Sequence, residues 1–108
     1  MADFRELSDA VMASPQLELA DVAEAQRRGV AVIVNNRPDG EDPGAPQGED
    51  IARAAEAAGI AYLAIPVTPG GFGEAEVEAM AAAMRDAAGP ILAYCRSGTR
   101  STFLWALA

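Results

Sequence analysis

The single cysteine, Cys95, lies in the stretch AYCRSGTRS at residues 93–101. An apolar run precedes it, and Arg96, Gly98 and Arg100 follow within five residues. A thiol at a strand-to-helix turn faces converging backbone amides and the positive end of the helix dipole. Together with two guanidinium groups, these should lower the thiol pKa well below the ~8.5 of a free cysteine. This pattern predicts a thiolate nucleophile.

The residues after Cys95 suggest how the thiolate is held. We expect the amides of Ser97, Gly98 and Thr99 to line an anion pocket, with Gly98 allowing a backbone conformation that a side chain would obstruct. We expect the next helix to begin near Ser101, which could cap it or donate a hydrogen bond to the sulfur. The alternative is a buried, inert cysteine. The glycine and two arginines nearby favour a reactive or anion-binding role.

A second candidate group lies in the long polar stretch NNRPDGEDPGAPQG at residues 35–48. Asp39 could serve as a general acid, and Arg37 could bind substrate, because this loop leaves the carboxyl end of a predicted strand. However, Pro-Asp-Gly is also a common turn sequence. Both interpretations of Asp39 remain open at this point.

The elements that must position these residues alternate along the chain. Continuous apolar or β-rich runs predict strands over residues 9–15, 30–34, 60–67 and 90–94. Helical spacing predicts helices over 17–29, 49–59 and 74–89, and a last one that begins near residue 101. This order predicts an α/β fold with a small, mainly parallel sheet flanked by helices. We expect residues 1–108 to form one catalytic domain whose last helix is cut short.

Composition excludes several function classes. The chain has 108 residues and a net charge of −8, with all 16 acidic residues before residue 91. Such a chain is a poor nucleic-acid binder. No apolar run approaches the ~20 residues of a membrane span, and no signal peptide is visible. With one cysteine and no histidine, we expect no disulfide, no metal and no cofactor. A free thiol suits the cytoplasm, where we expect the protein to reside.

The active-site stretch carries a family resemblance. YCRSGTRS resembles the active-site loop of single-domain rhodanese-type sulfurtransferases and is similar to the anion-binding loop of cysteine-dependent tyrosine phosphatases. With NNRPDGE at 35–41 and IPV at 65–67, it resembles more closely the phosphatase-like domains of β-lactamase-hydrolase-like proteins, which are also described as sulfur transferases. The resemblance implies a thiol persulfide substrate and a metallo-β-lactamase-fold partner.

Loop length discriminates between the two chemistries. Tyrosine phosphatases place five residues between cysteine and arginine, whereas Cys95 and Arg100 are separated by four. The tighter loop favours a single sulfur atom carried as a Cys95 persulfide, so we expect a sulfurtransferase. The alternative is a phosphatase that forms a Cys95 phosphocysteine with Asp39 as its acid. A third class is a non-catalytic anion-binding or sensor module.

Overall fold

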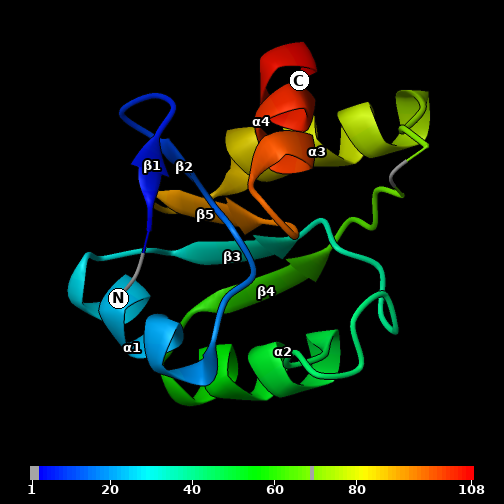
Figure 1. Cartoon of the computed structure of the whole chain (residues 1–108). Helices are drawn as coiled ribbons and strands as arrows, with labels where there is room; N and C mark the ends of the chain where they lie inside the picture. Colours follow the sequence, from blue (N-terminus) through cyan, green and yellow to red (C-terminus); the bar gives the residue numbers. More distant parts are fainter. Residues whose placement is uncertain (1–2, 69) are drawn as a thin grey trace.

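A five-stranded sheet runs through the middle of the computed structural model, which describes residues 3–68 and 70–108. Its strand order is β1-β2-β5-β3-β4 (Figure 1). The strands are β1 (Arg5–Glu6), β2 (Val11–Ser14), β3 (Val32–Asn35), β4 (Ala61–Ala64) and β5 (Ile91–Tyr94). Only β1 is antiparallel to its neighbour, and the other pairs are parallel. The predicted mainly parallel sheet is therefore confirmed.

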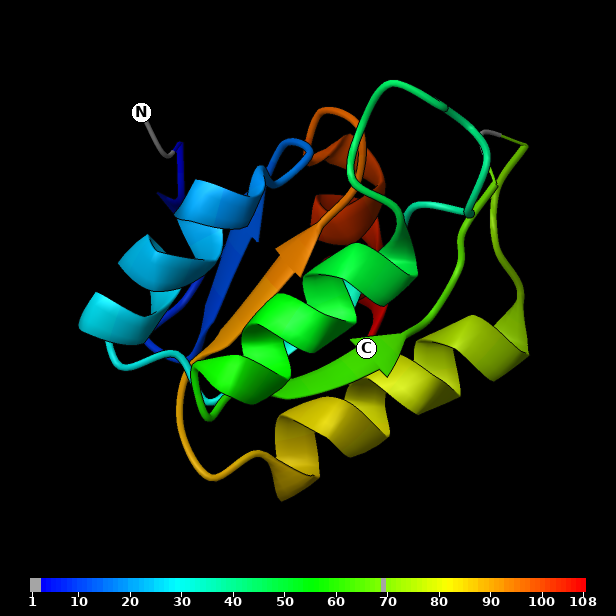
Figure 2. The ribbon, with the colours of Figure 1, turned by 90° about the horizontal axis from the view of Figure 1, so that it is seen from below.

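Two helices cover each face of this sheet. They are α1 (Leu19–Arg27), α2 (Gly48–Ala57), α3 (Glu74–Asp86) and α4 (Thr99–Leu107). Helices α1 and α2 pack together on one face, and α3 and α4 on the other (Figures 1 and 2). Each pair packs on the sheet through its own apolar cluster: Ile51 of α2 joins Ile33 of β3 on one face, and Met80 of α3 joins Val34 of β3 on the other. Because both faces of β3 and β5 are covered, every residue of these strands is buried, and all but Asn35 at the end of β3 are apolar or aromatic.

The structure corrects the expected start of the last helix. Helix α4 begins at Thr99, and its N-cap is Gly98 with φ +92°. Ser101 therefore lies inside the first turn, and its expected role as helix cap is wrong. The expectation followed the general preference for serine at N-caps. Here the tight turn after β5 needs a left-handed residue, which glycine adopts without strain. The short strand β1 was not predicted, because its two residues are charged and exposed.

The strand register gathers the candidate residues at one edge of the sheet. Tyr94, the last residue of β5, is in register with Ser14 of β2 and Asn35 of β3. Residues that directly follow these three strands therefore lie together at the carboxyl edge, where ligands bind in open α/β sheets. Within residues 3–68 and 70–108, no helix is long and apolar enough to cross a membrane.

Candidate active site

Cys95 follows the central strand β5 at this carboxyl edge and is 0% exposed. Its backbone N–H donates to the carbonyl of Ser14 at 3.3 Å, which fixes the start of the loop against β2. Its Sγ accepts a hydrogen bond from the Gly98 amide at 3.1 Å. The four residues from Cys95 to Gly98 thus fold back so that the backbone itself holds the sulfur.

Opposing effects act on the ionisation of this thiol. Burial raises the pKa of Cys95, but hydrogen bonds from the backbone and hydroxyl of Ser101 and from the amides of Ser97 and Gly98 outweigh it. The net result is a pKa below the ordinary thiol value, so the sulfur is more nucleophilic near neutral pH. The sequence-based choice of amides needs one correction. The Thr99 amide donates to the Ser97 hydroxyl at 3.4 Å, and the amide of Ser101, at the start of α4, acts on the sulfur instead.

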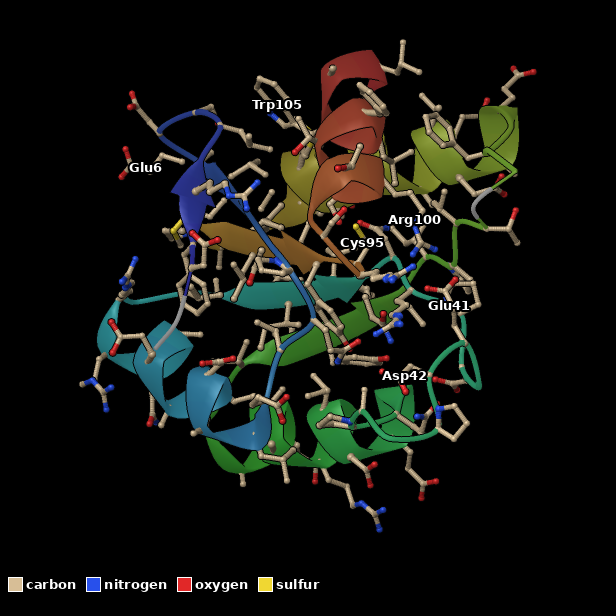
Figure 3. The ribbon with its side chains drawn as sticks, viewed as in Figure 1. Glu6, Glu41, Asp42, Cys95, Arg100 and Trp105 are labelled. Atoms are coloured by element: carbon tan, nitrogen blue, oxygen red, sulfur yellow. The ribbon has the colours of Figure 1, made fainter. Side chains whose placement is uncertain are left out.

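Arg100 projects from the first turn of α4, and three of its five N–H groups donate hydrogen bonds to oxygens of Val67 and Glu41. Nη1 donates to the carbonyl of Val67 at 2.7 Å and to Glu41 Oε2 at 2.9 Å, and Nη2 donates to Glu41 Oε1 at 2.7 Å. The hydrogen bond to Glu41 raises the pKa of Arg100, and the adjacent Cys95 sulfur also contributes. The guanidinium therefore lies beside the sulfur (Figure 3).

Two N–H groups of Arg100 remain, one on Nε and one on Nη2. Neither donates to an oxygen within the described ranges 3–68 and 70–108. They form the side edge of the planar guanidinium and point in parallel, a geometry that matches two oxygens of a phosphate or carboxylate. Glu41 and Val67 hold the rest of the guanidinium, and the Cys95 sulfur interacts with Arg100. This two-pronged edge is therefore the part of Arg100 that a group carried on Cys95 would meet.

Glu41 is the functional residue that the sequence analysis missed. Its Oε1 also accepts from Arg37 Nε at 2.8 Å, and Arg37 Nη1 in turn donates to Gln16 Oε1 at 2.9 Å. Hydrogen bonding from Arg100, then from Arg37, lowers the pKa of Glu41 to about 2 despite the opposing effect of burial. The carboxylate is thus ionised and anchors both arginines. The i,i+4 spacing of Arg37 and Glu41 was the only local signal.

Arg37 and Asp39 help to hold the loop in place. The Arg37 amide donates to Asn35 Oδ1 at 2.8 Å, and its side chain reaches Glu41 and Gln16. Asp39 Oδ1 accepts from the Gly48 amide at 2.8 Å and so satisfies the start of α2. Its role as a general acid stays a prediction. Arg96 is exposed at the rim of the site.

The two loops of the site lie next to each other in space. Figure 2 shows the loop of residues 36–47 arching beside the turn that follows β5, and Figure 3 shows Glu41, Arg100 and Cys95 converging at their meeting point. We call the first the arginine-anchoring loop (residues 36–47) and the second the cysteine loop (residues 95–98). Together they place a thiolate, a ring of amides and a fixed guanidinium at one spot.

Comparison with known proteins identifies the family. The family model of the phosphatase-like domain of β-lactamase-hydrolase-like proteins matches residues 3–108. A β-lactamase-hydrolase-like protein of Agrobacterium fabrum is 40% identical over 89 residues, which are 82% of this chain and 21% of that protein. One of Xylella fastidiosa is 42% identical over 81 residues, 75% of this chain and 19% of that protein. The chain thus spans about a fifth of the curated relatives it matches.

Solved structures place the fold among phosphatase-like proteins. A candidate phosphatase from Neisseria meningitidis has a TM-score of 0.86 and 36% identity, covering 93% of this chain and 71% of its own. TpbA of Pseudomonas aeruginosa has a TM-score of 0.64 and 24% identity, covering 88% of this chain and 54% of its own, and shows the fold alone. The chain belongs to the family of phosphatase-like domains of β-lactamase-hydrolase-like proteins, and it has a cysteine-phosphatase-like α/β fold.

Proposed function

We propose that this member of the phosphatase-like family hydrolyses a phosphate monoester through a phosphocysteine on Cys95. The observation that carries the proposal is the open side edge of Arg100 next to the sulfur. Two parallel N–H groups suit two oxygens of a tetrahedral phosphate, whereas the single terminal atom of a persulfide uses only one of them. The family model and the likeness to the Neisseria meningitidis protein support the same chemistry. This reverses the preference for sulfur that loop length suggested.

The proposed reaction has two displacements at phosphorus. The Cys95 thiolate attacks, the S–P bond forms, and the P–O bond to the leaving group breaks. Water then attacks phosphorus, the S–P bond breaks, and inorganic phosphate and the Cys95 thiolate are released. One proton of the water passes through the solvent to the alkoxide or phenolate that left in the first step. The amides around the sulfur and the Arg100 edge hold the phosphoryl oxygens in both steps. The Ser101 hydroxyl and amide stabilise the thiolate that departs in the second step.

The site offers the departing oxygen of the leaving group less support than it offers the phosphoryl group, because protonation of that oxygen needs an acid. Glu41 is ionised and bound to two arginines, and the Asp39 carboxylate binds the start of α2. The ionised Glu41 carboxylate cannot protonate a departing alkoxide, and the role of Asp39 as the general acid stays a prediction. We therefore expect aryl phosphates, whose phenolates leave readily, to be better substrates than alkyl phosphates.

Sulfane-sulfur transfer is the second candidate, and the four-residue spacing between Cys95 and Arg100 favours it. The thiolate would attack the outer sulfur of a thiol persulfide, the S–S bond would break, and the donor thiolate would leave. An acceptor thiolate would then attack the outer sulfur of the Cys95 persulfide. A metallo-β-lactamase-fold partner and a cytoplasmic location, both expected from the sequence, belong to this proposal and stay predictions.

One experiment separates the two candidates. The protein is incubated with p-nitrophenyl phosphate in one arm, and with thiosulfate or glutathione persulfide in the other. Turnover and intact mass are measured for the wild type and Cys95→Ser. Phosphate release that needs Cys95, without a sulfur adduct, supports the proposal. A reducible gain of one sulfur atom without phosphate release overturns it in favour of transfer. If neither occurs, the anion-binding module is the better description.

A further inference from the structure

Asn36 is a fully buried polar residue whose backbone groups and side-chain amide are all hydrogen-bonded. Its amide N–H donates to the carbonyl of Tyr94 at 2.8 Å, and its carbonyl accepts from the Val67 amide at 2.9 Å. Its side-chain Nδ2 donates to the carbonyl of Ile65 at 2.9 Å. Because a carbonyl can only accept, this bond fixes the orientation of the side-chain amide. The other atom, Oδ1, must then be the one that faces Ser101, and it can only accept.

The Ser101 hydroxyl is the donor to this oxygen. Its Oγ lies 2.8 Å from Asn36 Oδ1, and Ser101 is 0% exposed. Cys95 Sγ accepts from the amide of Gly98, the residue just before α4, at 3.1 Å, and Ser101 lies in the first turn of that helix. Because the same hydroxyl also lowers the pKa of Cys95, we infer that it lies within reach of the sulfur. A hydroxyl carries one proton. It can give that proton to Asn36 or to the sulfur, but not fully to both.

The two protonation states of Cys95 therefore require two arrangements. With a neutral thiol, the S–H can donate to Ser101 Oγ while the hydroxyl donates to Asn36 Oδ1, and every polar atom is paired. With a thiolate, the hydroxyl turns toward the sulfur and leaves Asn36 Oδ1 buried without its donor. An unpaired buried acceptor is costly. Asn36 thus works against ionisation of the cysteine.

We propose that Asn36 is a positioning residue that limits ionisation of Cys95 by competing with its sulfur for the single proton of the Ser101 hydroxyl. It acts alongside the charges that face the site. These are Arg100 of α4, next to the sulfur, and, behind it, Glu41 and Arg37 of the arginine-anchoring loop. None of these charged groups touches the Asn36 side chain among the hydrogen bonds of residues 3–68 and 70–108. The variants below leave all three in place.

The test is the pH dependence of alkylation of Cys95 by iodoacetamide, which needs no substrate. In Asn36→Leu, which keeps the shape but removes the acceptor, the midpoint should fall by about one pH unit, because the hydroxyl is released to the sulfur. In Ser101→Ala the midpoint should rise. In the double variant, Asn36→Leu should no longer lower the midpoint. A merely structural role predicts the opposite sign, since a loosened ring of amides stabilises the thiolate less. An unchanged or raised alkylation midpoint in folded Asn36→Leu overturns the proposal. So does a double variant in which Asn36→Leu lowers the midpoint of Ser101→Ala as much as it lowers that of the wild type.

A second measurement uses the wild-type protein and so does not depend on a variant that folds poorly. The ¹³C resonance of the Asn36 side-chain carbonyl is followed by NMR through the titration of Cys95. Its chemical shift should change with pH, with the same midpoint as the alkylation of Cys95, because Asn36 Oδ1 loses the hydrogen bond from Ser101. This pH-dependent change should be absent in Ser101→Ala. A resonance that does not respond in the wild type overturns the proposal. Either result is independent of whether the transferred group is phosphate or sulfur.

Discussion

The cysteine loop and the arginine-anchoring loop meet at one point but are held in different ways. Residues 95–98 form a tight turn in which the Gly98 amide and the φ of +92° at Gly98 set the geometry. Residues 36–47 are much longer and are held mostly by side chains: Asp39 on Gly48, Gln47 on Gly40, and Glu41 on two arginines. In the proposed function the first loop supplies the nucleophile, and the second holds Arg100 through Glu41. We infer that the reactivity of Cys95 and the orientation of Arg100 can be changed independently by mutations in the two loops.

The largest effect is expected at the nucleophile. Cys95→Ser should lower turnover by about 10⁴-fold or more, because serine has no low-pKa thiolate and no neighbouring base. The melting temperature should stay near that of the wild type, since the side chains are close in size. Steady-state kinetics and circular dichroism give the two readings. Turnover above a hundredth of the wild-type rate would show that the cysteine loop is not the reacting part.

Replacing the two arginines compares the loops directly. Arg100→Lys should lower kcat/KM by about 10²- to 10³-fold, since lysine lacks the two-pronged edge beside the sulfur. Arg37→Lys should cost less than about tenfold, because the Arg37 side chain bonds Gln16 and Glu41 and reaches Arg100 only through Glu41. Kinetics with p-nitrophenyl phosphate measure both. Equal losses would mean that Arg37 also contacts the substrate.

The anchoring of the second loop can be tested through two glycines. A Cβ on Gly48 would lie 2.7 Å from Tyr62 Oη and 2.9 Å from Asp39 Oδ1, whereas one on Gly44 would meet Asp42 Oδ1 at 3.4 Å. Gly48→Ala should therefore destabilise the fold by about 2 kcal/mol in urea unfolding, because the Asp39 contact must break. Gly44→Ala, the matched control, should change the free energy of unfolding little. A stable Gly48→Ala protein would show that the contact of Asp39 with α2 is dispensable.

Replacing Glu41 tests the orientation of Arg100 separately from the reactivity of Cys95. Glu41→Gln should lower kcat by about tenfold with the thiol still reactive toward iodoacetamide, because Arg100 loses its charged partner but stays in place. Asp42→Asn is the matched control, since Asp42 binds only the Gly44 amide, at 2.9 Å, through its side chain within the described ranges. Equal activity of Glu41→Gln and wild type would show that Val67 alone orients Arg100.

Acid should weaken the second loop before the first. The pKa of Glu41 is lowered from 4.5 to about 2 in the folded protein, so its stabilising effect is complete above about pH 4.5 and is lost as the pH falls through 2. The stability difference between wild type and Glu41→Gln should thus shrink by roughly 2–3 kcal/mol between pH 7 and pH 2.5. Urea unfolding at both pH values measures this. A constant difference would show that the ion pairs add no pH-dependent stability.

Some of this site could be predicted from the sequence. The apolar runs before Asn35 and Cys95 predicted the two central strands, and their parallel order placed the cysteine at the carboxyl edge. Local spacing also suggested a thiolate held by amides. These predictions succeed because backbone geometry depends mostly on nearby residues.

The remainder depends on contacts between distant residues. Arg100 and Glu41 are 59 positions apart, and Ser101 and Asn36 are 65 apart. Glu41 is one of 16 acidic residues, and nothing local marks it as the one that meets Arg100. The start of α4 was misplaced because a serine that looks like a cap bonds instead across the sheet edge to Asn36.

The position of β5 in the sheet has a consequence for biosynthesis. Among the five described strands it comes last in sequence, yet it lies between β2 and β3 and pairs with both. Until residues 91–94 are made, β2 has no parallel partner and this sheet cannot close. Non-local pairing of this kind is slow. The reactive cysteine follows the strand that completes the sheet, so its low-pKa environment forms only when folding finishes. A nascent or misfolded chain would carry an ordinary thiol.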